Sequence, residues 1–172
     1  DALAAEPGEL HILATGSTTN LGAAELLRPG CLADAASITL MGGVTRALAI
    51  NGRIMDELNL SCDAAATALV LASGAPTAIA TSQHCLPAFF TRADLAGAFG
   101  ERSWLYRTCD HWFCTMDAAY DQSGWTCWDV VAAAHLAHPE LFCAQPSAVT
   151  LYERFLAVGY LALVIGAERS AQ

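Results

Sequence analysis

Short apolar runs alternate with helix-like segments along the first half of the chain. The runs that predict strands are residues 9–15, 36–41 and 75–81, and the intervening segments that predict helices are residues 21–28 and 63–73. Nearly continuous apolar runs are typical of parallel strands that are buried on both faces. Asp63 is a suitable N-cap for the second helix, and Gly74 follows its end. This order predicts an α/β fold, with a mostly parallel sheet flanked by helices in a single domain of residues 1–172.

The second half of the chain is less regular and is predicted to be mainly helical. Residues 91–99 and 104–120 have helical composition, and residues 123–126 interrupt the pattern. A further helix is expected over residues 128–136, with Thr126 as its N-cap.

Trp128 and Asp129 open that last helix, and each residue has two interpretations. A carboxylate in a first turn commonly complements the helix dipole, but Asp129 could equally be directed at a metal ion or a sugar. Trp128 is either part of the core or an aromatic platform on which a ligand stacks. The pattern alone leaves both alternatives open.

Polar residues follow each of the three predicted strands, at residues 15–20, 41–59 and 81–84. The carboxyl ends of parallel strands meet at one edge of a sheet, where ligands bind in α/β folds. Asn51, Glu57 and Asn59 offer amide donors, amide acceptors and a carboxylate, which suit a polyhydroxyl ligand such as a sugar. The alternative is a solvated loop. His84 is the histidine to consider for catalysis, because it lies at a predicted strand end.

Charge and composition limit the partners that the chain can have. The net charge is −9, from 17 acidic and 8 basic residues, and the basic residues form no cluster. Nucleic acid and anionic membranes are therefore excluded as expected partners, and no apolar run is long enough to span a bilayer. The seven cysteines are odd in number and scattered, which favours free thiols and a reducing, cytoplasmic location. Charged residues make up only 15% of the chain, which suggests apolar surface that meets a partner or a missing part of the same protein.

Four motifs resemble those of the nucleoside hydrolases, in the purine-leaning branch of the inosine/uridine-preferring family. Residues 14–21 resemble "TGPLTNL", residues 40–43 "LMGG", residues 51–63 "GN…AEFNIYCDP", and residues 128–142 "HDPLAVA…PELF". They occur in the family's order and spacing, and the resemblance covers roughly residues 6–142.

The resemblance implies a reaction and a metal. These enzymes hydrolyse the N-glycosidic bond of ribonucleosides to ribose and free base, and a bound Ca²⁺ organises the reaction. By resemblance, Thr15 gives its backbone carbonyl to Ca²⁺ and Asp129 gives a carboxylate. Both are hard oxygen ligands of the kind that calcium prefers.

The resemblance also assigns residues to the substrate. Asn51 and Glu57 would hold the ribose 5′-hydroxyl, Asn59 the 2′/3′-hydroxyl region, and Met41 would pack beside the sugar. Trp128 occupies the position at which uridine-accepting members carry histidine. An indole can stack on a purine, so this difference points to a purine ribonucleoside.

One departure concerns the catalytic base. The family's "DTDxGxDD" strand end, which supplies the general base and most calcium carboxylates, has no counterpart in this chain. No catalytic residue is therefore identified. Residues 152–166 are unusually apolar and lack the family's usual ending. We expect the C-terminal portion of a nucleoside hydrolase, truncated at the N-terminus.

Three hypotheses follow from that departure. The chain could be part of a hydrolase, either as a homo-oligomer or in association with a missing N-terminal portion. It could be a non-catalytic ribose- or nucleoside-binding relative that lost the general base. It could also be a degenerate relative in which the motifs only determine the fold.

Overall fold

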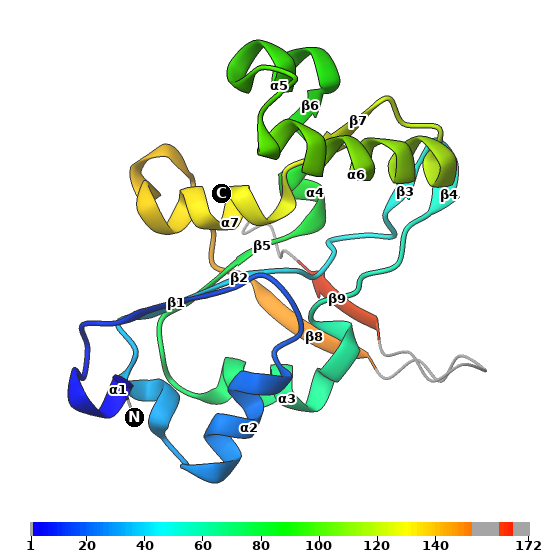
Figure 1. The fold of residues 1–172 in the computed structure, drawn as a ribbon. Coiled ribbons are helices and arrows are strands. Elements are labelled where there is room, and N and C mark those ends of the chain that lie inside the picture. The colour runs from blue at the N-terminus through cyan, green and yellow to red at the C-terminus, as the bar shows by residue number, and fades with distance from the viewer. Residues whose placement is uncertain (1, 153–161, 167–172) are drawn as a thin grey trace.

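A three-stranded parallel sheet in the order β1-β2-β5 lies at the centre of the molecule (Figure 1). The computed structural model describes residues 2–152 and 162–166. The strands are β1 (His11–Ala14), β2 (Ser37–Met41) and β5 (Thr77–Ala80). In the register, Ala14 is paired with Leu40, which is paired with Ile79. The predicted α/β fold with a parallel sheet is confirmed.

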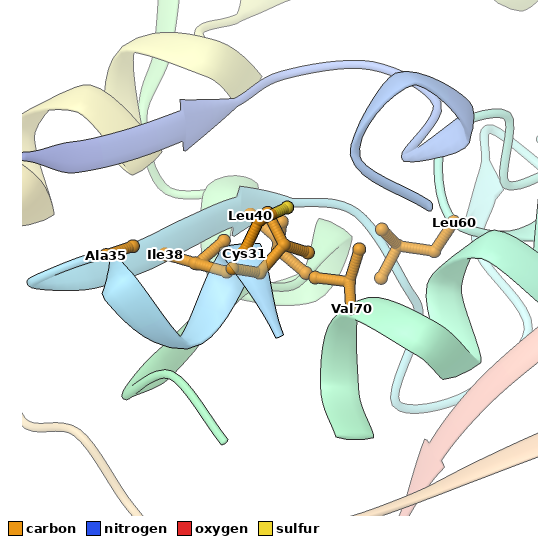
Figure 2. Packing of buried hydrophobic residues seen from close by; sticks show 7 residues of the cluster. Cys31, Ala35, Ile38, Leu40, Leu60 and Val70 are labelled. Atoms are coloured by element: carbon orange, nitrogen blue, oxygen red, sulfur yellow. The ribbon is translucent and has the colours of Figure 1, made fainter. Parts of the chain in front are cut away.

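Helices cover both faces of this sheet. Figure 1 shows α1 (Ala2–Ala5), α2 (Thr19–Leu27) and α3 (Ala64–Ala72) on one face, and α7 (Trp128–Ala137) on the other. On the first face, Ile38 and Leu40 of β2 pack with Leu60 and Val70, and all four side chains are fully buried (Figure 2). Burying one such side chain contributes about 1.5–3 kcal/mol. This cluster is the main core of the described chain, because it contains more buried residues than either of the other two clusters.

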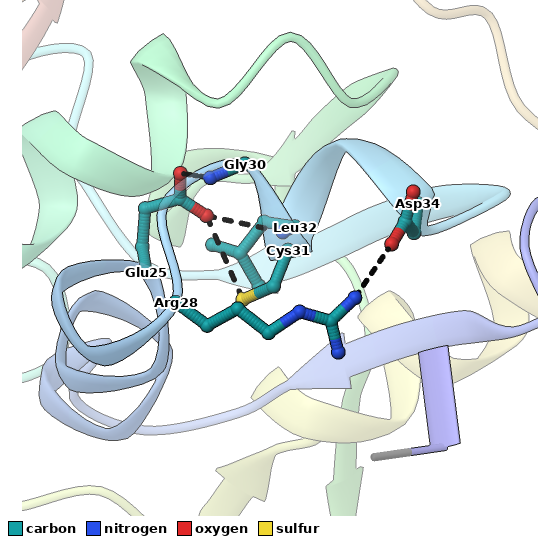
Figure 3. Close-up of polar contacts among 6 residues, drawn as sticks. All are labelled: Glu25, Arg28, Gly30, Cys31, Leu32 and Asp34. Carbon is teal, nitrogen blue, oxygen red and sulfur yellow. Dashed lines mark hydrogen bonds and ion pairs between the residues drawn. The ribbon is translucent and has the colours of Figure 1, made fainter. Parts of the chain in front are cut away.

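A carboxylate organises the turn that follows α2. Glu25 accepts hydrogen bonds from the backbone N–H groups of Gly30 and Leu32, and from the thiol of Cys31 (Figure 3). The two backbone hydrogen bonds lower the pKa of Glu25. The same turn leads into the 3₁₀-helix η1 (Cys31–Asp34), which is joined to the end of α2 by an ion pair between Arg28 and Asp34 at 3.3 Å.

The polar segment after β2 is more structured than the predicted loop. It contains a β-hairpin of β3 (Ala49–Ile50) and β4 (Arg53–Ile54). Asn51 and Gly52 form its two-residue turn with φ angles of 48° and 78°, as expected of an Asn-Gly type I′ turn. The 3₁₀-helix η2 (Ser61–Asp63) follows, and Asp63 caps α3 by accepting a hydrogen bond from Ala66 N at 2.9 Å. The predicted cap is confirmed.

The second half forms a smaller group of elements beside the sheet (Figure 1). Its elements are α4 (Ser82–Cys85), β6 (Phe89–Thr91), α5 (Arg92–Phe99), α6 (Trp104–Tyr120), β7 (Gly124–Thr126) and η3 (Pro139–Leu141). The predicted interruption at residues 123–126 is instead strand β7, paired antiparallel with β6. Thr126 was wrongly expected to cap α7: it is the buried last residue of β7, and Cys127 occupies the N-cap position without a side-chain hydrogen bond.

The last described elements are the antiparallel strands β8 (Ala148–Tyr152) and β9 (Ala162–Gly166). Within the apolar segment 152–166, residues 153–161 lie outside the described part of the chain. Among the described helices, none combines the length and apolar character needed to cross a membrane.

Candidate active site

The carboxyl ends of the three parallel strands lie side by side, as predicted. Met41 ends β2 and is paired with Ala80 of β5, while Thr15 follows Ala14 of β1, whose partner is Leu40. Thr15 and Met41 therefore lie at the same level of the sheet. This edge receives the polar segment that follows β2.

The Glu57 carboxylate holds that segment in place. Its Oε1 atom accepts hydrogen bonds from the backbone N–H groups of Gly43 (3.1 Å), Asn59 (2.9 Å) and Leu60 (2.9 Å), and Oε2 accepts one from Ser61 N (2.6 Å). The side chain is partly buried. Its carboxylate thus fixes the end of β2 to the start of η2, and with it the position of Asn59.

Asn59 connects this loop to Met41. Its side-chain nitrogen donates to the Met41 carbonyl at 3.0 Å and lies 3.1 Å from the Met41 sulfur. Met41 is buried in a cluster with Cys85 and Ala132, against which Trp128 packs. The structure therefore joins four predicted site residues, Glu57, Asn59, Met41 and Trp128, by a continuous series of contacts.

Asp129 lies in the first turn of α7, next to Trp128, and its side chain is partly enclosed but still exposed to solvent. Partial desolvation raises the pKa of Asp129. Whether this carboxylate complements the helix dipole or serves a ligand stays a prediction. Burial also raises the pKa of the neighbouring Cys85 thiol to about 11, and the Asp129 charge adds to this effect.

The Asn51 side chain forms hydrogen bonds with the end of α6 and not with the other predicted site residues. Its side-chain nitrogen donates to the backbone carbonyls of Tyr120 (3.0 Å) and Asp121 (2.7 Å) at the end of α6. The neighbouring Arg53 also binds carbonyls of α6. Sequence analysis gave Arg53 no role, although the Asn-Gly pair before it signalled the hairpin that carries it.

His84 is exposed in α4, and its Nδ1 atom lies 2.9 Å from the Thr81 hydroxyl. This hydrogen bond is local to the turn after β5. A second hydroxyl pair was not anticipated: buried Thr18 and Thr67 lie 2.8 Å apart, and Thr67 also donates to Leu60 O. This pair ties the loop after β1 to α3.

The donors for a calcium ion are incomplete in the described residues. No group of three or more His, Cys, Asp or Glu side chains in residues 2–152 and 162–166 is placed to hold a metal ion. Ca²⁺ takes six to eight oxygen ligands, whereas the Asp129 carboxylate and the Thr15 carbonyl would supply only two donor groups. These residues do not form a calcium site by themselves.

Comparisons with known proteins agree with the predicted resemblance. The sequence model of the family described as "Inosine-uridine preferring nucleoside hydrolase" matches residues 1–165. The match is longer than the predicted resemblance over residues 6–142, and it includes the apolar C-terminal segment as far as residue 165. No protein of curated function matches the chain in sequence.

Solved structures show the same fold. A plant nucleoside hydrolase has a TM-score of 0.83 at 21% identity, over 99% of this chain and 54% of its own. A purine-preferring ribonucleoside hydrolase from Gardnerella vaginalis has a TM-score of 0.77 at 22% identity, over 95% of this chain and 53% of its own. An inosine-uridine preferring nucleoside hydrolase from Bacillus anthracis has a TM-score of 0.61 at 18% identity, over 91% of this chain and 54% of its own.

At these identities the structural likeness shows the fold alone, and the chain spans about half the length of the solved relatives it matches. The sequence match is the stronger observation, because it covers nearly the whole chain and includes the residues that meet at the carboxyl edge of the sheet. The chain belongs to the inosine-uridine preferring nucleoside hydrolase family.

Proposed function

We propose that this chain supplies part of the ribose, base and metal site of a hydrolase that cleaves the N-glycosidic bond of purine ribonucleosides in a calcium-dependent reaction. The observation that carries the proposal is the series of contacts from Glu57 through Asn59 to Met41, and from the cluster of Met41, Cys85 and Ala132 to Trp128. It lies at the edge of the sheet where α/β folds bind ligands, in a chain of this family.

Each of these side chains has a defined part in the proposed binding. Asn59 is held against Met41 and presents its amide to the 2′/3′-hydroxyl region of the ribose. Glu57 and Asn51 serve the 5′-hydroxyl, and Met41 packs beside the sugar. Cleavage of the glycosidic bond places positive charge on the ribose, and polar groups that are already oriented stabilise such a charge without reorganising.

Trp128 supports a purine substrate. Its side chain packs against the Met41 cluster at the start of α7, and that contact limits the positions that the indole can take. A large aromatic surface favours a large aromatic base, because stacking gains with contact area. We therefore propose inosine, adenosine or guanosine in preference to uridine.

We propose that Asp129 and the Thr15 carbonyl contribute to Ca²⁺ binding, and that the remaining ligands and the general base come from outside the described residues. The ion would supply positive charge that orients the substrate hydroxyls. We further propose that the protein acts as a homo-oligomer, or together with the N-terminal portion of the fold, in the cytoplasm. The seven free cysteines are compatible with that reducing compartment.

The test is calorimetric titration of the purified protein with inosine and with uridine, each with Ca²⁺ and with a chelator. We expect inosine to bind more tightly than uridine, and Trp128→His to reduce that preference. Release of ribose is measured in parallel, with subunit composition determined by light scattering. Binding without ribose release would identify a nucleoside-binding relative, and equal binding of both nucleosides would refute the purine preference. Absence of binding by the assembled protein would refute the proposed function.

A further inference from the structure

Two buried threonines join the loop after β1 to the start of α3. Thr18 and Thr67 are fully buried, and their hydroxyl oxygens lie 2.8 Å apart. The Thr67 oxygen also lies 2.8 Å from the Leu60 carbonyl oxygen and 3.0 Å from the carbonyl oxygen of Asp63. A buried hydroxyl without a partner is costly, and in this arrangement both hydroxyls have one.

The carbonyl groups determine the direction of these hydrogen bonds. A hydroxyl has one proton to donate and two lone pairs that accept, whereas a carbonyl oxygen only accepts. Thr67 therefore donates its proton to the carbonyls of Leu60 and Asp63, which share it, and its oxygen is left to accept the proton of Thr18. The hydrogen bonds thus run in one direction, from Thr18 through Thr67 to Leu60.

Thr18 makes this long-range contact in place of a local one. It occupies the N-cap position of α2, where a threonine hydroxyl commonly accepts a hydrogen bond from the first turn of the helix. The Thr18 side chain makes no such cap hydrogen bond. The motif "TGPLTNL", which residues 14–21 resemble, has leucine at the position of Thr18. The resemblance therefore assigns Thr18 no role, and its contact with Thr67 follows from the structure.

The close packing of α2 on α3 brings the two hydroxyls together. Gly22 lies four residues after Thr18, and Ala66 directly precedes Thr67. A Cβ atom on Gly22 would lie 2.5 Å from Ala66 Cβ, so the two helices meet at a distance that a larger residue would not permit. Figure 1 shows α2 beside α3. The contact between the hydroxyls depends on this close approach.

The Leu60 carbonyl connects the hydroxyl pair to the candidate site. Leu60 is fully buried, and its N–H donates to the Glu57 carboxylate at 2.9 Å. Its carbonyl accepts from Thr67, so the backbone of Leu60 is held on both sides. Asn59, the residue proposed to meet the ribose, directly precedes it. The pair therefore joins the loop after β1 to the polar segment after β2, and both follow strands that end at the same edge of the sheet.

We propose that Thr18 and Thr67 are positioning residues of the candidate site. Their two hydrogen bonds fix the Leu60 carbonyl, and with it the amide of the adjacent Asn59, relative to the loop after β1. The effect on the substrate rests on the function proposed above, whereas the hydroxyl pair stands on the contacts themselves.

The hydroxyl pair is tested first, without ligand, by urea denaturation of the full chain. Thr67→Val keeps the shape of the side chain but leaves the Thr18 hydroxyl without a partner, so the equilibrium constant of unfolding should rise about tenfold. Adding Thr18→Val to this variant should cause no further rise, because it removes the unpartnered hydroxyl. Effects of the two substitutions that multiply in the double variant would overturn the pair.

Thr39→Val is the matched control for this measurement. Thr39 is also buried, and its hydroxyl makes no hydrogen bond within residues 2–152 and 162–166. Its replacement by valine removes no partner from another group, so the equilibrium constant of unfolding should change by less than about threefold.

The positioning role is tested by equilibrium binding of inosine and 2′-deoxyinosine to the assembled protein. Asn59 is proposed to meet the 2′/3′-hydroxyl region, so wild type and Thr39→Val should bind inosine about tenfold more tightly. Thr67→Val should reduce this ratio to below about threefold, and Thr67→Ser, which keeps the hydroxyl, should restore most of it. Partial unfolding lowers the number of binding sites and leaves the ratio unchanged. Thr18→Val should lower the ratio as well, and it is the second variant if Thr67→Val does not fold.

The outcomes separate this inference from the proposed function. If Thr67→Val leaves the ratio at the wild-type value, the pair only stabilises the fold and the positioning role is wrong. If wild type binds both nucleosides equally, the Asn59 contact and the positioning role fail together, while nucleoside binding survives. If wild type binds neither nucleoside, the proposed function and the positioning role both fail, and denaturation of the single and double variants still decides the hydroxyl pair.

Discussion

At the scale of single residues, Glu57 is a proposed ribose ligand that also holds the fold together. Its carboxylate accepts four backbone N–H groups. Glu57→Gln puts an N–H₂ group among these donors, so at least one buried N–H loses its acceptor. We expect this substitution to lower the free energy of unfolding by about 1–3 kcal/mol, measured by urea denaturation. Asp56→Asn, at the neighbouring exposed carboxylate, is the control and should change little. Equal effects of the two substitutions would contradict the role given to Glu57.

Asp129, the proposed calcium ligand, should lower the stability of the folded protein where it is charged, whereas Glu57 stabilises it. Its pKa is raised by desolvation, so the folded protein binds this proton more tightly than the unfolded chain. The stability that this gives is present below the ordinary carboxyl pKa and is lost as the pH rises through the raised pKa. Asp129→Asn cannot titrate, so the variant should gain stability relative to wild type over that pH range, by at most about 1 kcal/mol because the side chain is partly solvated.

Asp94 is the opposite-sign control for this measurement. Its carboxylate caps α5 by accepting hydrogen bonds from Thr91 N and from the Thr91 hydroxyl, which lower its pKa. The contribution of Asp94 is therefore present above the ordinary carboxyl pKa and lost as the pH falls. Asp94→Asn should thus lose stability relative to wild type as the pH rises. A parallel pH dependence for the two variants, followed by chemical denaturation, would show that desolvation does not dominate at Asp129.

At the scale of elements, the close packing of α2 on α3 depends on one glycine. A Cβ atom on Gly22 would lie 2.5 Å from Ala66 Cβ and 2.7 Å from Ala66 Cα, so the helices would have to separate. Gly22→Ala should destabilise the fold by about 1–3 kcal/mol, although alanine is the better helix former. Gly97→Ala in α5 is the matched control, because nothing lies within 4 Å of its added Cβ. It should stabilise by about 0.5–1 kcal/mol in the same thermal or urea assay.

The helices and strands differ in how well the sequence predicted them. Apolar runs located β1, β2, β5, α2, α3 and α7, because burial determines these elements, and local capping by Asp63 also marked the start of α3. The short strands β3, β4, β6 and β7 were missed. Asn51-Gly52 was a hairpin signal that the polar composition of its neighbours obscured. The need for Gly124 lies in the close approach of Phe89 and Phe90 from the partner strand, which no local pattern records.

The sequence predicted some features of the candidate site and missed others. Parallel topology placed the ends of β1, β2 and β5 together, as predicted, whereas the packing of Trp128 against the cluster that contains Met41 was not predicted. The hydrogen bonds of Asn51 to α6 were not predicted either, because that contact joins segments about seventy residues apart and depends on which carbonyls the helix end leaves free. Whether Asn51 and Glu57 meet a ribose stays a prediction.

At the scale of the whole molecule, calcium affinity measures how much of the metal site the chain contains. Affinity for Ca²⁺ rises with the number of charged oxygen ligands and with the rigidity of the site. The described residues hold no group of three metal-binding side chains, and Asp129 is the carboxylate proposed for the ion. We expect the chain alone to bind Ca²⁺ no more tightly than about millimolar, in the range of weak sites, and Asp129→Asn to remove that binding. Asp56→Asn, which removes the same charge outside the strand-end contacts, should leave it intact. Micromolar affinity that survives Asp129→Asn would show that the ion binds elsewhere, and the calcium ligands proposed for this edge of the sheet would be wrong.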